Sequence, residues 1–283
     1  MDTIHFASEH MCIGAFRCST SSARFEDSGP IGGYLIVFPR TGVYITYAGG
    51  SPIVADPNVV MFYNHGQEYR RSKLSDRGDC SDWFAFEPQL VRDAIACHDP
   101  GVAGRSDRLF TLTHAPSDPH TYVRQRHIVE RLLRAEPSDP MFVEEAMLSV
   151  LGAALDRAYR AWGQQPARAA AEPSKLSAEL MHAVKELLAV SFRERLSLDD
   201  IARRVYCSPY HLCRLFHQQT GTTIHRYLVQ LRLRTALEYV SEPGTDLATL
   251  GAELGFASHS HFTQAFRSVF GSAPSALRRS MSQ

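Results

Sequence analysis

The C-terminal part of the chain nearly repeats itself, and this repeat constrains the fold more than any other feature of the sequence. Ile201 recurs as Leu250, 49 residues later, and Phe216 recurs as Phe266, 50 residues later. Each copy has the pattern of a short helix, a tight turn and a second helix that ends at a glycine. This order of elements is the helix-turn-helix plan, and two copies in one chain are far more specific than one.

Four helices are predicted for the two copies, over about residues 198–205, 209–219, 246–254 and 259–270. Ser208 and Ser258 stand where an N-cap hydroxyl is expected, and Gly221 and Gly271 stand where a left-handed C-cap is expected. The segment between the copies predicts a linker helix with one apolar face, formed by Ile224, Tyr227, Leu228, Leu231, Leu237 and Val240. A continuous helix would fix the distance between the copies, so that both second helices could enter successive major grooves, about 34 Å apart.

Three stretches of this region resemble the AraC/XylS type of transcription regulator. They are Ser208–Phe216 followed by Thr220-Gly221, Arg232–Ala236, and Leu254–Phe262 followed by Phe266-Arg267, Phe270-Gly271 and Pro274. The resemblance covers about 100 residues. It implies a sequence-specific DNA-binding regulator, more often an activator, with double-stranded DNA and RNA polymerase as partners. The sequence departs from the family pattern at Tyr206-Cys207, where Tyr206 is expected to affect the turn, and at Leu277.

Pattern and resemblance agree on the first reading surface. At 100° per residue, Leu212, Leu215 and Phe216 share the inward face of the helix, and the positions that contact bases in the family fall on the outward face. Base contacts are predicted for Tyr210, Cys213 and Arg214 in the first copy and for His259, Ser260 and Gln264 in the second. Arg214 suits guanine and Gln264 suits adenine. Phosphate contacts are predicted for Arg203, Arg204, His217, Arg226, Arg232, Arg234, His261 and Arg267.

Charge and composition divide the chain in the same way. Residues 1–173 carry 17 Lys and Arg against 21 Asp and Glu, whereas residues 174–283 carry 13 against 9. Only the second part is therefore expected to meet an anionic partner. The predicted divisions are a sensor barrel over 1–118, a helical hairpin over 119–162, a linker over 163–175 and a DNA-binding domain over 176–283.

The front part is predicted to be a β-barrel, which with the helical back part gives an α+β chain. Four runs of β-branched and aromatic residues predict strands at 34–38, 43–47, 59–63 and 83–86. Residues 1–30 are interpreted as a flexible arm and residues 91–118 mostly as loop. The region from Gly42 to Glu68 resembles, more weakly, the cupin-like sensor domain of many such regulators. That resemblance implies a small effector in the barrel, for which the candidate residues are Tyr34, Tyr44, Tyr47, Tyr63, Tyr69 and Trp83.

The helical hairpin has two interpretations. Val143, Met147, Val150 and Ala154 form a stripe at helical spacing, which suits either a cover for the barrel or a dimer interface between two copies of the chain. The prediction is a homodimer that uses these four residues.

The cysteines leave a second function open. Cys12, Cys18, Cys80 and Cys97 lie in the front part and could sense a metal or an oxidant, although buried cysteines usually only pack. Their spacing offers no zinc pair, and residues 1–173 contain no His-x-His, so no metal site, cofactor or enzymatic activity is predicted. An enzyme fused to a DNA reader and an effector-free DNA-binding protein are further alternatives. A cytoplasmic protein is expected, since the sequence shows neither a membrane span nor a signal peptide.

Overall fold

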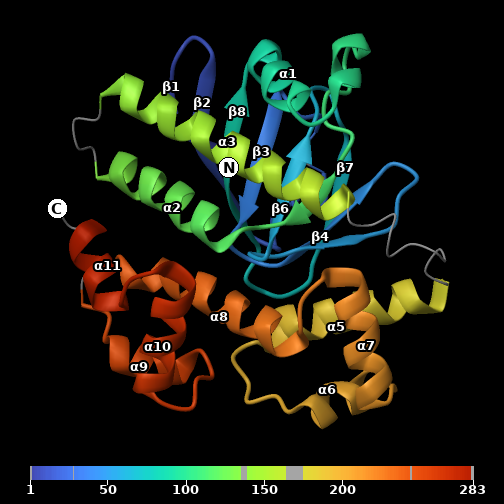
Figure 1. The fold of residues 1–283 in the computed structure, drawn as a ribbon, viewed down its shortest axis with the longest axis vertical. Helices are drawn as coiled ribbons and strands as arrows, with labels where there is room; N and C mark the ends of the chain where they lie inside the picture. Colours follow the sequence, from blue (N-terminus) through green and yellow to red (C-terminus); the bar gives the residue numbers. More distant parts are fainter. Residues whose placement is uncertain (1, 28, 135–138, 164–174, 243, 282–283) are drawn as a thin grey trace. The chain divides into compact units, whose positions relative to one another are not determined.

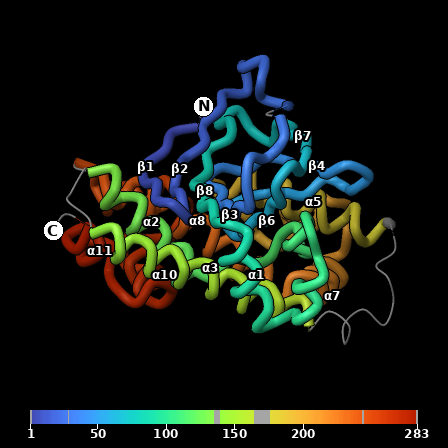
Figure 2. The backbone as a smooth tube through the Cα atoms, turned by 90° about the horizontal axis from the view of Figure 1, so that it is seen from above, coloured from blue at the N-terminus to red at the C-terminus, as the bar shows by residue number. Residues whose placement is uncertain are grey.

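The computed structural model describes residues 2–27, 29–134, 139–163, 175–242 and 244–281. The chain divides into two compact units, residues 1–163 and 164–283 (Figure 1, Figure 2). The first unit is built on antiparallel sheets and the second is helical, which confirms the predicted α+β class. The linker predicted at 163–175 lies almost entirely outside the described residues.

The first unit contains two antiparallel sheets. The larger has the order β1 (Asp2–Ala7), β2 (Met11–Cys18), β8 (Asp79–Phe86), β3 (Tyr34–Pro39), β6 (Val59–Tyr63) and β9 (His114–Pro116). The smaller has the order β5 (Ile53–Ala55), β4 (Val43–Tyr47) and β7 (Tyr69–Ser72). The four predicted strands are all present. The prediction of a flexible arm over residues 1–30 is wrong, because β1 and β2 pair with each other and β2 pairs with β8 along its length.

The side chains of strand β8 show that one face of the larger sheet lines a cavity and the other face packs against helices. Successive side chains of a strand point to opposite faces, and here Ser81 and Trp83 face a half-open cavity between the sheets. Asp82 and Phe84 alternate with them, are fully buried, and face the helices on the other side. Both faces of the sheet are therefore covered at its centre, which explains why the central strands β3 and β6 read as nearly continuous apolar runs.

Helices cover the outer face of the larger sheet. They are α1 (Pro88–Ala96), the 3₁₀ turn η1 (Pro100–Gly104), α2 (Pro119–Leu133) and α3 (Pro140–Gly163). Helix α2 is fixed to the sheet by Tyr122, whose hydroxyl donates to the Pro39 carbonyl at 3.3 Å, and by Arg126, whose Nη1 lies 2.7 Å from Asp82 Oδ2. Figure 1 shows α2 and α3 running side by side. Part of the segment predicted as loop is thus helical, in α1 and η1.

The residues predicted for the dimer interface are buried inside the first unit. Val143, Met147, Val150 and Ala154 are all at most 3% exposed. A side chain buried in its own core is not available to a partner helix, so the assignment of these four residues to a dimer interface is wrong. The stripe is the covering face of α3, the other interpretation that the sequence left open.

The second unit consists of seven helices among the described residues. They are α5 (Lys175–Ser191), α6 (Leu198–Arg204), α7 (Pro209–Thr220), α8 (Ile224–Val240), α9 (Leu247–Glu253), α10 (His259–Phe270) and α11 (Pro274–Met281). The predicted repeat is confirmed, since α6–α7 and α9–α10 are two helix-turn-helix motifs and α8 joins them. All six apolar residues predicted for the face of the linker helix are buried. No helix in the described segments combines the length and the apolar character that crossing a bilayer requires.

Candidate nucleic-acid interface and ligand cavity

Helix α7 presents a polar face whose position is fixed by its caps. Ser208 Oγ accepts a hydrogen bond from the His211 N–H, Pro209 occupies the first turn, and Gly221 ends the helix with φ +71°. These are the ends that the sequence predicts, and each satisfies backbone groups that the helix leaves open. Leu212, Leu215 and Phe216 anchor the inner face in the core. The helix is therefore held at both ends and along one side.

The outward face of α7 carries the predicted reading residues. Tyr210 is 80% exposed, and Cys213, Arg214 and His217 are also exposed. All four lie on the side opposite the buried leucines, so the structure leaves them accessible to a groove of DNA. An arginine there has a planar fork of donors that matches guanine N7 and O6.

Helix α10 presents the second polar face. Ser258 Oγ accepts from the His261 N–H at 3.1 Å, and Gly271 ends the helix with φ +77°. Phe262, Phe266 and Phe270 are buried in a ladder of ring contacts. The predicted contact residues His259, Ser260, His261, Gln264 and Arg267 are exposed.

The turns of the two motifs have the same backbone conformation. Tyr206 and Gly255 occupy equivalent positions, with φ values of +53° and +81°. The turn is therefore unchanged by the tyrosine, contrary to the expectation from the sequence. Tyr206 is 98% exposed and is the only non-glycine residue of the described chain with a positive φ. A side chain in this region is strained by roughly 1 kcal/mol or more.

Two of the arginines predicted to bind phosphate are buried instead. Arg234 is fully buried, and Arg232 is 7% exposed with three backbone carbonyls around its guanidinium. Arg232 Nε donates to Phe192 at 2.6 Å, Nη1 to Gly255 at 2.9 Å and Nη2 to Glu194 at 2.6 Å. The predicted phosphate role is wrong for both, because the sequence pattern does not show that this side of α8 packs against the rest of the unit.

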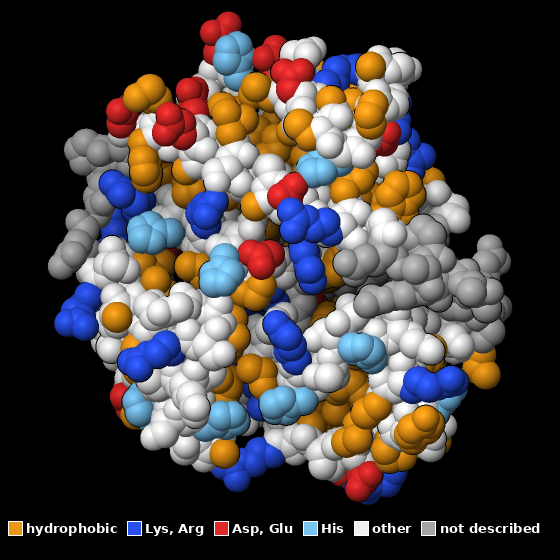
Figure 3. Space-filling view, in the orientation of Figure 1, with side chains coloured by type: hydrophobic (Ala, Val, Ile, Leu, Met, Phe, Trp, Pro, Cys, Tyr) orange, Lys and Arg blue, Asp and Glu red, His pale blue; other side chains and the backbone are white. Residues whose placement is uncertain are grey.

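The remaining arginines of the predicted set are on the surface. Arg226 is exposed near the start of α8, Arg203 pairs with Asp200, and Arg204 lies 3.0 Å from Glu194. Exposed ion pairs of this kind are weak, so they exchange readily for a phosphate partner. On the face of the second unit seen in Figure 3, blue Lys and Arg and pale blue His side chains are spread widely, whereas red Asp and Glu side chains are sparse.

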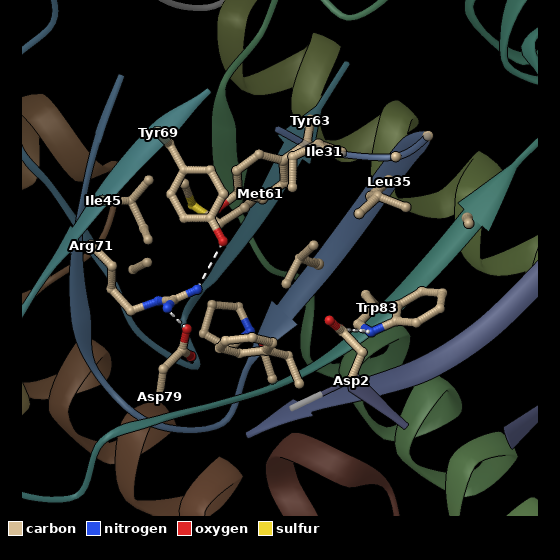
Figure 4. Close-up of a pocket in the computed structure, with 18 of the residues that line it drawn as sticks. Asp2, Ile31, Leu35, Ile45, Met61, Tyr63, Tyr69, Arg71, Asp79 and Trp83 are labelled. Atoms are coloured by element: carbon tan, nitrogen blue, oxygen red, sulfur yellow. Dashed lines mark hydrogen bonds and ion pairs between the residues drawn. The ribbon is translucent and has the colours of Figure 1, made fainter. Parts of the chain in front are cut away.

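The first unit holds a half-open cavity of about 350 Å³ between its two sheets. Figure 4 shows aliphatic side chains such as Leu35, Ile45 and Met61 on its walls, with the aromatic rings of Tyr63, Tyr69 and Trp83 among them. The segment 29–33 also lines it, and the Ile31 N–H donates to the Gln67 carbonyl at 3.1 Å. Volume and lining match the size and apolar character of small-molecule sites.

A buried ion pair lies on one wall of this cavity. Arg71 is 1% exposed, and its Nε lies 2.6 Å from Asp79 Oδ2. The other nitrogens of Arg71 donate to the Phe25 carbonyl at 2.9 Å and to the Tyr69 hydroxyl at 2.8 Å. Burial raises the pKa of the Asp79 carboxyl from 3.8 to about 6, although the neighbouring Arg71 acts in the opposite direction.

Three of the six aromatic residues predicted for the effector site line the cavity. They are Tyr63, Tyr69 and Trp83. The prediction that Tyr34 lines the effector site is wrong, because this side chain lies on the opposite face of β3, where its hydroxyl donates to the Asp107 carbonyl. Tyr44 and Tyr47 do not line the cavity either; Tyr47 packs on the ring of Tyr63 instead. Sequence reasoning missed Arg71, on the short strand β7, and Asp79, at the start of β8, because a charged residue in a strand is not by itself a signal of an inward position.

The cysteines do not form a common site. Cys12 lines the cavity, and burial raises the pKa of its thiol, which disfavours the reactive thiolate. Cys18 and Cys80 are half-buried, and Cys97 is exposed at the end of α1. Across the part of the chain that the structure describes, no three His, Cys, Asp or Glu side chains are grouped closely enough to hold a metal ion.

Comparison with known proteins agrees with the helical motifs. A family model described as a helix-turn-helix domain matches residues 201–280. The Msm operon regulatory protein of Streptococcus mutans is 24% identical over 187 residues, which cover 65% of this chain and 58% of that protein. The HTH-type transcriptional regulator YidL of Escherichia coli is 35% identical over 96 residues, covering 34% of this chain and 32% of that one. The chain therefore spans less than two thirds of the length of these relatives. Among solved structures, ToxT from Vibrio cholerae overlaps 97% of this chain and 99% of its own, at 12% identity and a TM-score of 0.36.

Proposed function

Given that the chain carries an AraC/XylS-type domain with two helix-turn-helix motifs, we propose that it is a transcription regulator that reads double-stranded DNA under the control of a small effector. The observation that carries the DNA part is the pair α7 and α10. Both helices are capped at each end, both are anchored by buried apolar residues, and both expose polar side chains on the opposite face.

The linker helix favours recognition of two DNA half-sites, one by each helix-turn-helix motif, over recognition of a single site. Helix α8 spans 17 residues, which corresponds to about 25 Å of length at 1.5 Å per residue. Its buried residues pack between the two motifs, and Arg232 connects it to the turn of the second one. A rigid connection of this kind favours two half-sites with a fixed spacing, close to one turn of DNA.

The effector part of the proposal is supported by the cavity of the first unit. This half-open cavity lies between two sheets, is mostly apolar, and is large enough for a compact organic molecule. The alternative, a thiol-based sensor of metals or oxidants, receives less support. Burial raises the pKa of the Cys12 thiol, and no three His, Cys, Asp or Glu side chains of the described residues are grouped closely enough to hold a metal ion. A contact with RNA polymerase stays a prediction from the family resemblance. The homodimer also stays a prediction, but the stripe of α3 from which it was made is buried.

The test of the proposed function is a binding-site selection with the full chain and a library of random double-stranded DNA. We expect enrichment of a motif with two parts separated by about 10 base pairs, the helical repeat of DNA. Binding to the enriched sequence should weaken steeply with salt, as phosphate contacts release counterions. Recovery of random sequences, or of a single short motif, would contradict a reading of two adjacent sites.

A further inference from the structure

We propose that the cavity between the two sheets binds a small, mostly apolar molecule that carries a cationic amine, with the carboxylates of Asp2 and Asp79 as partners of the amine. The inference rests on the proposed function, because it names the chemical class of the effector for the same cavity. The charges on the cavity wall, and the hydrogen bonds that these charges already make, favour this class of ligand.

Carboxylates outnumber cationic groups among the described residues that line the cavity. Asp2 and Asp79 contribute two carboxylates, and Arg71 is the one cationic side chain of this lining. Figure 4 shows them in two separate groups, with Arg71, Asp79 and Tyr69 in one and Asp2 with Trp83 in the other. Apolar side chains lie between the two groups. A ligand would therefore meet an apolar space with acidic groups at two places.

The single cation of the wall is already engaged. Arg71 makes its ion pair with Asp79 and donates to the Phe25 carbonyl and the Tyr69 hydroxyl. Its guanidinium also lies over the ring of Phe16, 4.4 Å from the ring centre. An anionic ligand would have to draw the guanidinium away from Asp79 and leave that carboxylate without its partner in a buried place. Breaking a buried pair in this way is strongly unfavourable, so the wall disfavours anions.

The charged groups of the wall leave acceptor capacity on the two carboxylates, whereas the hydroxyls of Ser81, Tyr63 and Tyr69 can both donate and accept. An ionised carboxylate only accepts, and it has room for several donors on its two oxygens. The ion pair with Arg71 uses Asp79 Oδ2, and the Trp83 indole N–H donates to Asp2 Oδ1 at 3.1 Å. An ammonium group supplies three donors and a positive charge, which suits acceptors of this kind. The rings of Tyr63, Tyr69 and Trp83 add faces that attract a cation.

The experiment is titration calorimetry on the full chain with three probes of one shape. Tryptamine carries an ammonium group, tryptophol a neutral hydroxyl and indole-3-propionate a carboxylate on the same ring system. We expect tryptamine to bind at least about tenfold more tightly than indole-3-propionate. The carboxylates of Asp2 and Asp79 attract the ammonium group of tryptamine and repel the carboxylate of indole-3-propionate. Filling the cavity with Ala85→Leu should weaken whichever probes bind there.

Two variants connect the preference to the named carboxylates. Asp2→Asn keeps an oxygen for the Trp83 N–H and should reduce the preference for tryptamine severalfold. Asp79→Asn should also reduce the preference for tryptamine. If Asp79→Asn does not fold, the result for Asp2→Asn alone tests the proposal. Asp76→Asn is the matched control, since Asp76 is exposed, pairs with Lys73 and does not line the cavity.

The outcomes separate the two proposals. Equal or tighter binding of indole-3-propionate or tryptophol, or an unchanged preference in Asp2→Asn, would overturn the amine class and leave a ligand-binding cavity. Binding of no probe at millimolar concentration, or binding that Ala85→Leu leaves unchanged, would overturn the cavity as the effector site itself.

Discussion

Arg232, near the middle of α8, donates a hydrogen bond through Nη1 to the carbonyl oxygen of Gly255, 2.9 Å away in the turn of the second motif. The same guanidinium binds the carbonyls of Phe192 and Glu194, which follow α5. Gly255 leaves space for this contact, because a Cβ there would lie 2.8 Å from Arg232 Nη2. One buried side chain thus connects the linker helix, the end of α5 and the second turn.

Replacing Arg232 by alanine should destabilise the second unit by about 3 kcal/mol or more, because three carbonyls lose a charged hydrogen-bond donor. Urea unfolding of the full chain, followed by far-UV circular dichroism, measures the loss. Arg226→Ala removes an exposed arginine from the same helix and should change the free energy of unfolding by less than about 0.5 kcal/mol. Equal effects of the two changes would contradict the role of Arg232 as a connector.

Replacing Tyr206 by glycine should stabilise the protein by about 1 kcal/mol, since a positive φ strains a residue that has a Cβ. The tyrosine is almost fully exposed, so its removal costs little packing. The control is Tyr206→Ala, which keeps the Cβ and therefore the strain. A shift of the urea midpoint by glycine and not by alanine is the expected result, and equal shifts would mean that the backbone is not the cause.

Replacing Arg214 by alanine should relax the base preference at one or two positions of the selected motif, with a loss of discrimination of about 1–3 kcal/mol. Gln264→Ala should relax positions in the other half of the motif, because it stands on α10. Arg279→Ala, which removes an exposed arginine on α11, serves as the control for lost charge. A selection profile of Arg214→Ala identical to that of the wild type would exclude Arg214 as a base-reading residue.

The Asp79 carboxyl predicts a specific dependence of stability on pH. Its pKa in the folded protein is about 6, above the 3.8 of the unfolded chain, so the folded state holds the proton more tightly. This contribution to the free energy of unfolding is complete below pH 4 and is lost as the pH rises towards 6 and above. Two pKa units correspond to roughly 3 kcal/mol as an order of magnitude. Urea unfolding at pH 4–7 should show this decline for the wild type relative to Asp79→Asn, and parallel curves would count against it.

Alanine substitutions at the neighbouring β8 residues Asp82 and Ser81 should lower the stability of the protein by different amounts. Asp82 is fully buried, with Arg126 at 2.7 Å and Arg40 at 3.6 Å, so Asp82→Ala should cost about 3–5 kcal/mol. Ser81 faces the cavity, and Ser81→Ala should cost less than about 1 kcal/mol. Thermal unfolding compares the two variants. A larger loss in Ser81→Ala would contradict the assignment of the two faces.

The second unit was largely predictable because its sequence signals are local. N-cap serines, C-cap glycines and apolar residues at helical spacing fix where each helix starts, ends and faces, and all these signals lie within a few turns of the chain. The buried arginines of α8 were missed for the opposite reason. The partners of Arg232 lie some 23 to 40 residues away, so nothing near it in the sequence marks it as buried.

The first unit was predicted only in part, because its neighbours are distant in sequence. The four richest apolar strands were found, whereas β1 and β2 were missed, since they are marked chiefly by their pairing and β8 lies more than 60 residues further on. Half of the aromatic residues predicted for the cavity do not line it, and strand geometry gives the reason. Alternation along a strand sends every second aromatic residue to the other face, and the sequence does not say which face holds the cavity.

Along the eight residues of β8, side chains that face the cavity alternate with side chains that face the helices. Residues that face the helices act on folding alone, whereas residues that face the cavity also determine what it accepts. Selection could therefore alter the cavity side of such a strand while the helix side stays constant. New signals could be acquired by changes at every second residue, with the architecture and the DNA preference inherited intact.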